Sequence, residues 1–298
     1  MRLLRDALLT AAGTAGTTLV WRRLQAHRSR PWAARWERTN HRGDPVTLLE
    51  GVALVAGTTG TALLTGAQWR STALPYAVAS LGAGALGALD DLRQDTDRKG
   101  LAGHLRELAH GRVTTGAIKV IGLAATGLVA VALQDVHDRQ RADAHQAGAT
   151  RSPEGSSVLT TVWGSLAGGA VVAGAANLAN LFDLRPGRAL KVGVLTGMPL
   201  VGTGPGSPGG AVTLGAALAL LPDDLAGRSM LGDTGANPLG AALGLALVQR
   251  QGPAARTASL TVVTALTLAS ERVSFTRVIE ATPPLRWLDE LGRAPAQA

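Results

Sequence analysis

Long apolar segments alternate with short polar connections along most of this chain. Most of these segments approach the roughly 17–25 residues that a helix needs to cross the hydrocarbon layer of a membrane. The nine segments are 3–20, 46–68, 73–90, 114–133, 157–180, 189–203, 208–222, 235–249 and 256–272. The sixth and seventh flank a Gly- and Pro-rich stretch, so they are either two short helices or one broken helix. The pattern predicts an all-α, polytopic integral membrane bundle of about nine transmembrane helices, with residues 1–298 forming a single domain.

The distribution of basic residues predicts which way the bundle faces. Nine crossings place the two termini on opposite sides of the membrane. If the N-terminus is outside, twenty Arg and Lys residues lie in the inside connections and the tail, against eight outside. Because cytoplasmic connections carry the excess of Lys and Arg, we expect an N-terminus outside the cell in a multi-pass protein of the cell membrane.

Composition agrees with a membrane protein and argues against a nucleic-acid binder. Charged residues make up 17% of the chain, against about 25% in soluble domains. The 38 glycines predict slim helices that pack closely, which would also permit a homodimer. A soluble Ala- and Gly-rich helical protein is the alternative. The net charge of +8 lies mostly in the connections, a pattern typical of attraction to lipid headgroups, so we expect membrane lipids and no nucleic acid as partners.

Three acidic clusters each follow an odd-numbered apolar segment, which places all of them on the cytoplasmic face. They are Asp90-Asp91, the group Asn177, Asn180 and Asp183, and Asp233 in Gly232-Asp233-Thr234-Gly235. Carboxylates at the ends of membrane helices are costly and usually functional. Carboxylate and amide oxygens at one membrane face suit a divalent cation and a phosphate.

Each cluster also has a purely structural interpretation. Asp90-Asp91 is also typical of a charged pair that ends a helix. The asparagines could form hydrogen bonds between helices, each worth about 1 kcal/mol. The glycine-flanked Asp233 could cap an ordinary turn. Lys99 and its basic neighbours could screen a pyrophosphate, although they also fit the positive-inside bias. Glu50 is expected at the membrane interface.

Taken in order, the motifs resemble those of the polyprenyl-phosphate N-acetylhexosamine-1-phosphate transferase superfamily. Its members include the phospho-MurNAc-pentapeptide translocase and the GlcNAc-1-phosphate transferases. The matching elements are Arg38-Thr39-Asn40-His41-Arg42-Gly43, Leu89-Asp90-Asp91, Lys99-Gly100-Leu101, residues 177–183, and Met230-Leu231-Gly232-Asp233-Thr234-Gly235. The resemblance extends from about residue 38 to residue 249.

The resemblance implies an Mg²⁺-dependent membrane enzyme of cell wall biogenesis. Such an enzyme transfers a sugar-1-phosphate from a UDP-sugar to polyprenyl phosphate and releases UMP, with its active site facing the cytoplasm. By motif, Asp233 resembles the Mg²⁺ ligand. The motifs assign catalytic roles to Asp90, Asp91 and Asp183, and substrate-binding roles to Asn177, Asn180 and Lys99.

The chain departs from the family in three places. The family usually continues with Asp-Gly-x-Asp-Gly after its first carboxylate, whereas Pro186 takes the second carboxylate position here. The histidine-rich cytoplasmic motif of the pentapeptide translocase and a tenth span are also missing. These departures argue against that translocase. They leave a different acceptor pathway, a changed donor, or a catalytically impaired relative that binds lipid phosphate or scaffolds envelope proteins. A transporter would need more charges within the spans than Lys119 and Glu50.

Overall fold

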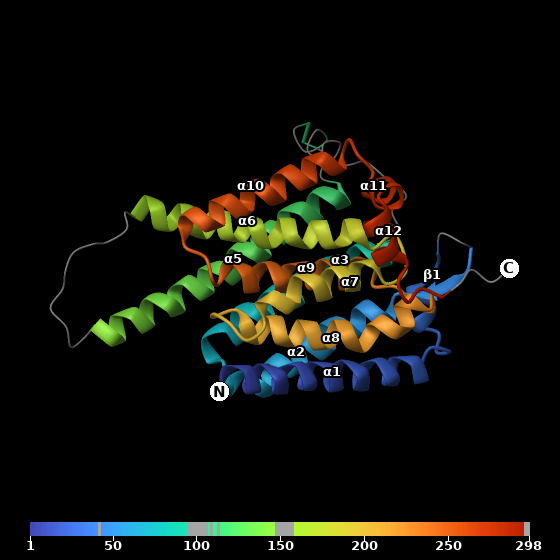
Figure 1. Ribbon diagram of the computed structural model, residues 1–298, viewed down its shortest axis with the longest axis horizontal. Coiled ribbons are helices and arrows are strands. Elements are labelled where there is room, and N and C mark those ends of the chain that lie inside the picture. The colour runs from blue at the N-terminus through green and yellow to red at the C-terminus, as the bar shows by residue number, and fades with distance from the viewer. Residues whose placement is uncertain (41–42, 94–106, 108–109, 112–113, 147–157, 295–298) are drawn as a thin grey trace.

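The protein is a bundle of helices that lie side by side along its long axis (Figure 1). A computed structural model describes residues 1–40, 43–93, 107, 110–111, 114–146 and 158–294. The described elements are α1 (Arg2–Ala26), η1 (Ala33–Trp36), β1 (Glu37–Thr39), β2 (Pro45–Thr47), α2 (Leu49–Thr65), η2 (Gly66–Gln68), α3 (Arg70–Arg93), α5 (Thr115–Gln146), α6 (Val158–Phe182), α7 (Arg188–Gly197), η3 (Met198–Leu200), α8 (Ser207–Leu225), α9 (Gly232–Val248), α10 (Pro253–Ser270), α11 (Phe275–Ala281) and α12 (Pro283–Glu290). The expected all-α class is confirmed, with one two-stranded antiparallel hairpin added.

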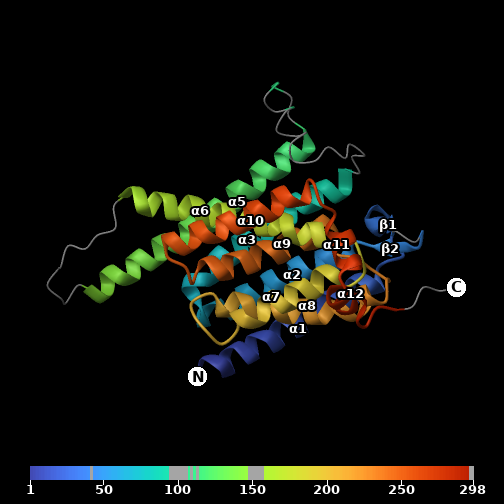
Figure 2. The same ribbon diagram turned by 45° about the horizontal axis from the view of Figure 1, so that its top comes forward.

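The connections between helices gather at the two ends of the bundle. Met1 lies at one end, and the β1–β2 hairpin, α11 and α12 lie at the other (Figure 2). We call the latter the site end. There the end of α3 meets the start of α9 through Asp91 and Thr234. At the opposite end, Asp6 of α1 accepts a hydrogen bond from Gly202, which precedes α8.

Three of the described helices are long and apolar enough to cross a membrane. They are Thr72–Arg93, Gly116–Asp143 and Val158–Phe182 within α3, α5 and α6, and Leu49–Thr65 is a shorter apolar helix. The ambiguous segments 189–203 and 208–222 form two separate helices, α7 and α8, with η3 after the first. At 1.5 Å per residue, the ten residues of α7 extend about 15 Å, half the hydrocarbon thickness.

Helix α9 forms the centre of the bundle, with α3 and α6 packed along it (Figure 1). After Asp233 it contains no charged residue, and almost every position is buried. Small residues allow this close packing, because a Cβ at Gly240 would collide with the carbonyl oxygen of Ala175 in α6. A Cβ at Gly87 of α3 would collide in the same way with the carbonyl of Asp233.

The start of α9 differs from the sequence-based expectation. The apolar segment was expected to begin at residue 235, but the helix already begins at Gly232, whose φ of +59° favours glycine. Asp233 therefore lies in the first helical turn, where backbone N–H groups are still unpaired. The short hairpin and the short helices α11 and α12 were not expected, because elements of three to eight residues leave little periodicity to detect.

Candidate functional site

Asp91 caps the start of α9 from a neighbouring helix. Its Oδ2 accepts hydrogen bonds from the backbone N–H of Thr234 at 2.8 Å and from the Thr234 hydroxyl at 2.6 Å. Its Oδ1 accepts from the N–H of Asp233 at 3.2 Å. The first N–H groups of a helix have no partner within the helix and carry partial positive charge. Asp91 satisfies two of them, so it joins α3 to α9.

Lys119 of α5 lies between two of the other carboxylates. Its Nζ donates to Asp90 Oδ2 at 3.1 Å and also pairs with Asp233 Oδ2. The three side chains remain 16–30% exposed, so a small ion or a phosphate oxygen can reach them. The cluster therefore combines two carboxylates with one ammonium group at the site end.

Sequence reasoning did not assign Lys119 to the site. The residue lies 29 positions after Asp90, within an apolar segment, and only the fold brings the two side chains together. A lone lysine inside such a segment was itself the available signal, because ionisable residues within membrane helices are rare and usually paired.

Asp183 adds a further carboxylate at the start of α9. Its Oδ2 accepts a hydrogen bond from the N–H of Gly232 at 2.8 Å. The side chain is buried in the turn that follows α6. Burial, and next the neighbouring charge of Asp224, raise the pKa of the Asp183 carboxyl well above its usual range. Asp91 and Asp183 thus both hold the N-terminus of α9.

A pocket of about 390 Å³ opens beside Asp183. Its walls come from the β1–β2 hairpin, from the α6–α7 connection and from the α8–α9 connection. The lining residues are Thr39, Asn40, Val46, Asp183, Leu184, Arg185, Pro186, Asp224, Gly227, Ser229 and Met230. Polar and charged groups line much of a volume that falls within the range of small-molecule sites.

The structure brings Asp90, Asp91, Asp183 and Asp233 together, as the preceding contacts describe. Asn177 and Asn180 lie half-buried in the last turns of α6, and neither is among the described residues that line the pocket. Lys99 lies outside the described residues.

Glu50, which was expected at the membrane interface, lies inside the protein. Its side chain is completely buried at the start of α2, within electrostatic reach of Asp224 and Asp183. Within the described part of the chain, neither Glu50 carboxylate oxygen has a hydrogen-bond partner. The β1–β2 hairpin and the α8–α9 connection pack over the start of α2. The hydrophobic periodicity of the sequence could not predict this packing.

Asp90 and Asp233 suit Mg²⁺ in chemistry, because both provide hard oxygen donors and both contact the same ammonium group, that of Lys119. Among the described residues, no group of three or more His, Asp or Glu side chains is arranged to hold a metal ion. Mg²⁺ is commonly bound by one or two carboxylates, with waters and substrate phosphates completing its shell. Two converging carboxylates therefore fit an ion that is shared with a phosphate substrate.

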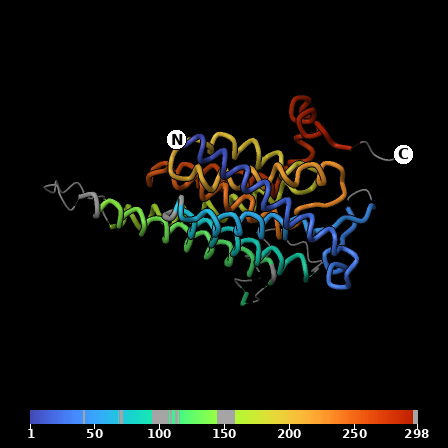
Figure 3. The backbone as a smooth tube through the Cα atoms, turned by 90° about the horizontal axis from the view of Figure 1, so that it is seen from below, coloured from blue at the N-terminus to red at the C-terminus, as the bar shows by residue number. Residues whose placement is uncertain are grey.

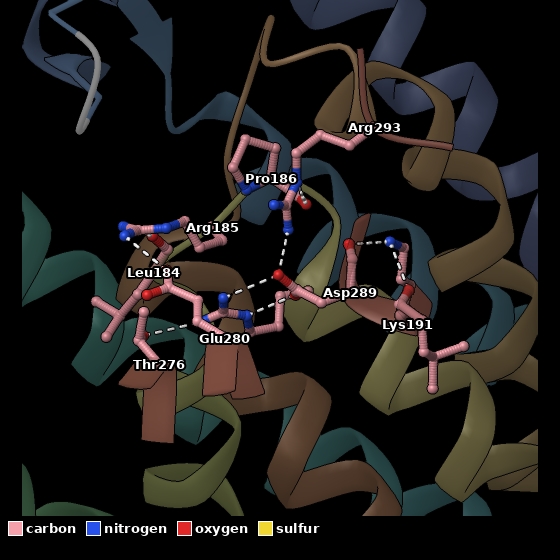
Figure 4. A network of polar contacts seen from close by, with 10 residues as sticks. Leu184, Arg185, Pro186, Lys191, Thr276, Glu280, Asp289 and Arg293 are labelled. Carbon is pink, nitrogen blue, oxygen red and sulfur yellow. Dashed lines mark hydrogen bonds and ion pairs between the residues drawn. The ribbon is translucent and has the colours of Figure 1, made fainter. Parts of the chain in front are cut away.

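The loop containing Pro186 is held from the other side by the C-terminal helices. Arg293 donates to the carbonyl oxygen of Pro186 at 3.3 Å, and Arg185 pairs with Glu280 of α11 at 3.3 Å (Figure 4). Arg188, at the start of α7, forms a buried pair with Asp289 of α12 at 2.7 Å. One wall of the pocket thus depends on contacts with α11 and α12.

No protein-family model matches this chain, and a search of curated proteins finds no significant match.

Proposed function

We propose that the protein is an Mg²⁺-dependent UDP-sugar:polyprenyl-phosphate sugar-1-phosphate transferase of cell-envelope glycan synthesis. An oxygen of polyprenyl phosphate attacks the phosphorus that carries the sugar. The bond from that phosphorus to the UMP oxygen breaks, polyprenyl diphosphate sugar forms, and UMP leaves. The donor class is a UDP-N-acetylhexosamine, and the reaction takes place at the cytoplasmic face of the cell membrane.

One observation carries this proposal: Asp90, Asp91, Asp183, Asp233 and Lys119 meet at the start of α9. They come from segments far apart in the sequence. Phosphoryl transfer requires little covalent chemistry from the protein and depends mainly on positioning and on charge stabilisation. A cluster of cation-binding carboxylates with a lysine, next to a polar pocket, suits that requirement.

Each group has a separate role in the proposed reaction. Asp233 and Asp90 would hold Mg²⁺, which when bound offsets the negative charge of the pyrophosphate. Lys119 balances the two carboxylates and approaches a phosphate oxygen when substrate enters. Asp91 keeps the start of α9 in place through its cap. A lipid phosphate is largely ionised near neutral pH, so Asp90 positions it more than it removes a proton.

The pocket beside Asp183 is the proposed site of the nucleotide sugar. Asn40, Arg185 and Ser229 supply polar groups there. Asn177, Asn180 and Lys99 keep the substrate-binding roles that the motif resemblance implies.

The proposed placement in the membrane has nine spans and an external N-terminus. The excess of basic residues in the connections of the site end motivates this orientation. In this arrangement α7 and η3 together form a short, interrupted span, which packs against α8 on one side and exposes Leu195 and Met198 on the other.

UMP release from a UDP-N-acetylhexosamine, measured with purified protein, polyprenyl phosphate and Mg²⁺, tests this function. Asp233→Asn should reduce the rate by about 100-fold or more, because one preorganised electrostatic contact is commonly worth that much. Asp143→Asn, an exposed change on α5 at the opposite end, should leave the rate unchanged. Undiminished turnover in Asp233→Asn would refute the metal assignment.

A specific observation favours a second candidate, a non-catalytic relative that binds lipid phosphate or scaffolds envelope proteins. Pro186 stands where the related enzymes have a carboxylate, and its carbonyl serves as an anchor for Arg293. This candidate predicts that polyprenyl phosphate raises the melting temperature without any UMP release across a panel of UDP-sugars.

A further inference from the structure

Three buried polar groups come together behind the wall of the pocket. They are Glu50 in the first turn of α2, Asp224 in the last turn of α8 and Ser229 in the α8–α9 connection, each 0–2% exposed. Within the described part of the protein, both Glu50 carboxylate oxygens, Asp224 Oδ2 and Ser229 Oγ lack a hydrogen-bond partner. Asp224 acts on Glu50 electrostatically and Ser229 adjoins it, so these oxygens share one enclosed region.

The tertiary structure brings these groups together at the site end. The β1–β2 hairpin leads into α2, and the backbone N–H of Met230 donates to the Thr47 carbonyl oxygen at 3.1 Å, which holds the α8–α9 connection against the hairpin. Figure 3 shows the hairpin in blue and the connection in orange at the end of the bundle away from the N-terminus. Asp224 and Ser229 also line the pocket, so the pocket gives access to the region, with Glu50 behind them.

The negative charge of this region lacks a paired cation. Among the described residues, no basic side chain bonds to either Glu50 oxygen or to Asp224 Oδ2. Lys191 and Arg293 act on Asp224 electrostatically, but Lys191 Nζ donates to backbone carbonyl oxygens of α12 at 3.1 and 2.5 Å, and Arg293 pairs with Asp289 at 2.8 Å. Buried carboxylates are costly unless they are paired or bind a metal.

The adjacent carboxylate of Asp223 shows the contrasting, fully paired arrangement. Trp21 Nε1 donates to one of its oxygens at 2.6 Å, and Arg228 Nε donates to the other at 2.7 Å. Asp224 is more deeply buried, yet its Oδ2 has no such donor in the described chain. The contrast indicates that the Asp224 carboxylate serves a ligand.

Burial and donor type restrict what can occupy the region. Its unpaired oxygens have almost no accessible surface, and a small ion between them requires less space than an organic cation. Carboxylate and hydroxyl oxygens are ligands for Mg²⁺, Ca²⁺ or Mn²⁺, whereas Zn²⁺ favours His and Cys. Two carboxylates, those of Glu50 and Asp224, balance the charge of one divalent ion.

We propose that Glu50, Asp224 and Ser229 form a binding site for a divalent cation, separate from the proposed Mg²⁺ site at Asp90 and Asp233. Two carboxylates are sufficient for such a site where water completes the shell of the ion, as is common for Mg²⁺. Because the ligands come from α2, α8 and the α8–α9 connection, the cation holds this wall of the pocket together. The inference goes beyond the proposed transferase activity and does not depend on it.

Mn²⁺ binding to the purified full-length protein in nonionic detergent tests this site, since the electron paramagnetic resonance signal of free Mn²⁺ weakens when the ion is bound. Asp233→Asn removes a ligand of the proposed Mg²⁺ site, and this variant should still bind one Mn²⁺ per chain. Adding Glu50→Gln should weaken that binding by about tenfold or more, and so should adding Asp224→Asn. Asp223→Asn is the matched control, and adding it should leave the binding unchanged.

Absence of bound Mn²⁺ in Asp233→Asn would overturn the proposal, because the region would then hold only protons or water. Binding that persists after both Glu50→Gln and Asp224→Asn would also overturn it. Thermal unfolding provides a second readout: Mn²⁺ should raise the melting temperature of Asp233→Asn, and Glu50→Gln should abolish that rise. None of these measurements requires UMP release, so failure of this site and failure of the transferase proposal are distinguishable.

Discussion

Adjacent residues Asp90 and Asp91 at the end of α3 face different partners, because successive helical side chains point about 100° apart. Asp91 meets backbone N–H groups of α9. Asp90 meets the ammonium of Lys119. One carboxylate of the pair therefore holds the fold, and the other pairs with a cationic side chain.

Replacing Lys119 should reveal the cation-binding capacity of this cluster. In Lys119→Met, Asp90 and Asp233 lose the ammonium that balances them, so a bound Mg²⁺ gains importance for stability. We expect Mg²⁺ to raise the melting temperature of Lys119→Met more than that of the unaltered protein, because ligand binding to the native state stabilises it. Thermal unfolding in detergent, with Mg²⁺ or with a chelator, measures the difference.

Lys119→Arg is the matched control, since it keeps a cation at the same position. Its response to Mg²⁺ should resemble that of the unaltered protein. If Mg²⁺ has no effect on Lys119→Met, Asp90 and Asp233 do not form a metal site.

At the scale of elements, close helix contacts determine where the carboxylates lie. α3 approaches α9 so closely at Gly87 that a Cβ there would collide with the Asp233 carbonyl. Gly87→Ala should therefore push the two helices apart, lower the melting temperature and reduce UMP release. Gly60→Ala in α2 is the control, because a Cβ there meets nothing within 4 Å. A fully active and stable Gly87→Ala would contradict the argued contact.

The docking of α12 should depend on pH through Asp289. Burial opposes ionisation of Asp289, but the hydrogen bonds and charges of Arg188 and Arg293 outweigh it and hold its pKa below the ordinary value. A carboxyl with a lowered folded-state pKa contributes stability above the unfolded-state pKa, and that stability is lost as pH falls through the folded-state value. The contribution should thus begin to fall near about pH 4 and disappear once the pH is below the lowered folded-state pKa.

Asp289→Asn isolates this contribution. At neutral pH it leaves Arg188 buried without its counter-charge, which costs about 3–5 kcal/mol in comparable pairs. Melting curves of Asp289→Asn and of the unaltered protein should converge as pH falls from about 5 to about 3. Glu290→Gln should keep the acid response of the unaltered protein. A difference between the two proteins that stays constant across this range would contradict the ion-pair argument.

At the scale of the whole molecule, the proposed transferase function requires the proposed orientation in the membrane, because only then would the site end face the cytoplasmic nucleotide sugar. The cysteine-free chain permits a direct measurement. Arg30→Cys lies at the site end after α1, and Ala254→Cys lies at the start of α10 at the opposite end; both positions are exposed. In intact cells, a membrane-impermeant maleimide should label position 254, and should label position 30 only after permeabilisation. The reverse pattern would invert the proposed topology.

Much of the helical architecture could be read from hydrophobic patterning, because a membrane helix must satisfy its own backbone hydrogen bonds and cover them with apolar side chains. The predicted segment 73–90 lies within α3. The predicted segment 157–180 begins just before α6 and otherwise lies within it. The short helices α11 and α12 were not predicted, since they contain too few turns for periodicity to distinguish helix from loop. The extension of α5 to Gln146 was not predicted, because its polar last turns resemble a connection between helices.

The sequence by itself determined the helical class, the alternation of the apolar segments and the identity of the acidic motifs, because these follow from local periodicity and from parity. Only the tertiary structure decided what each charged group does. Contacts between distant segments place Lys119 between Asp90 and Asp233, bury Glu50 inside the protein, and pair Asp289 with Arg188. Such contacts depend on which helix backbones can approach closely, as at Gly87 and Gly240, and on the arrangement of all helices together rather than on any single segment.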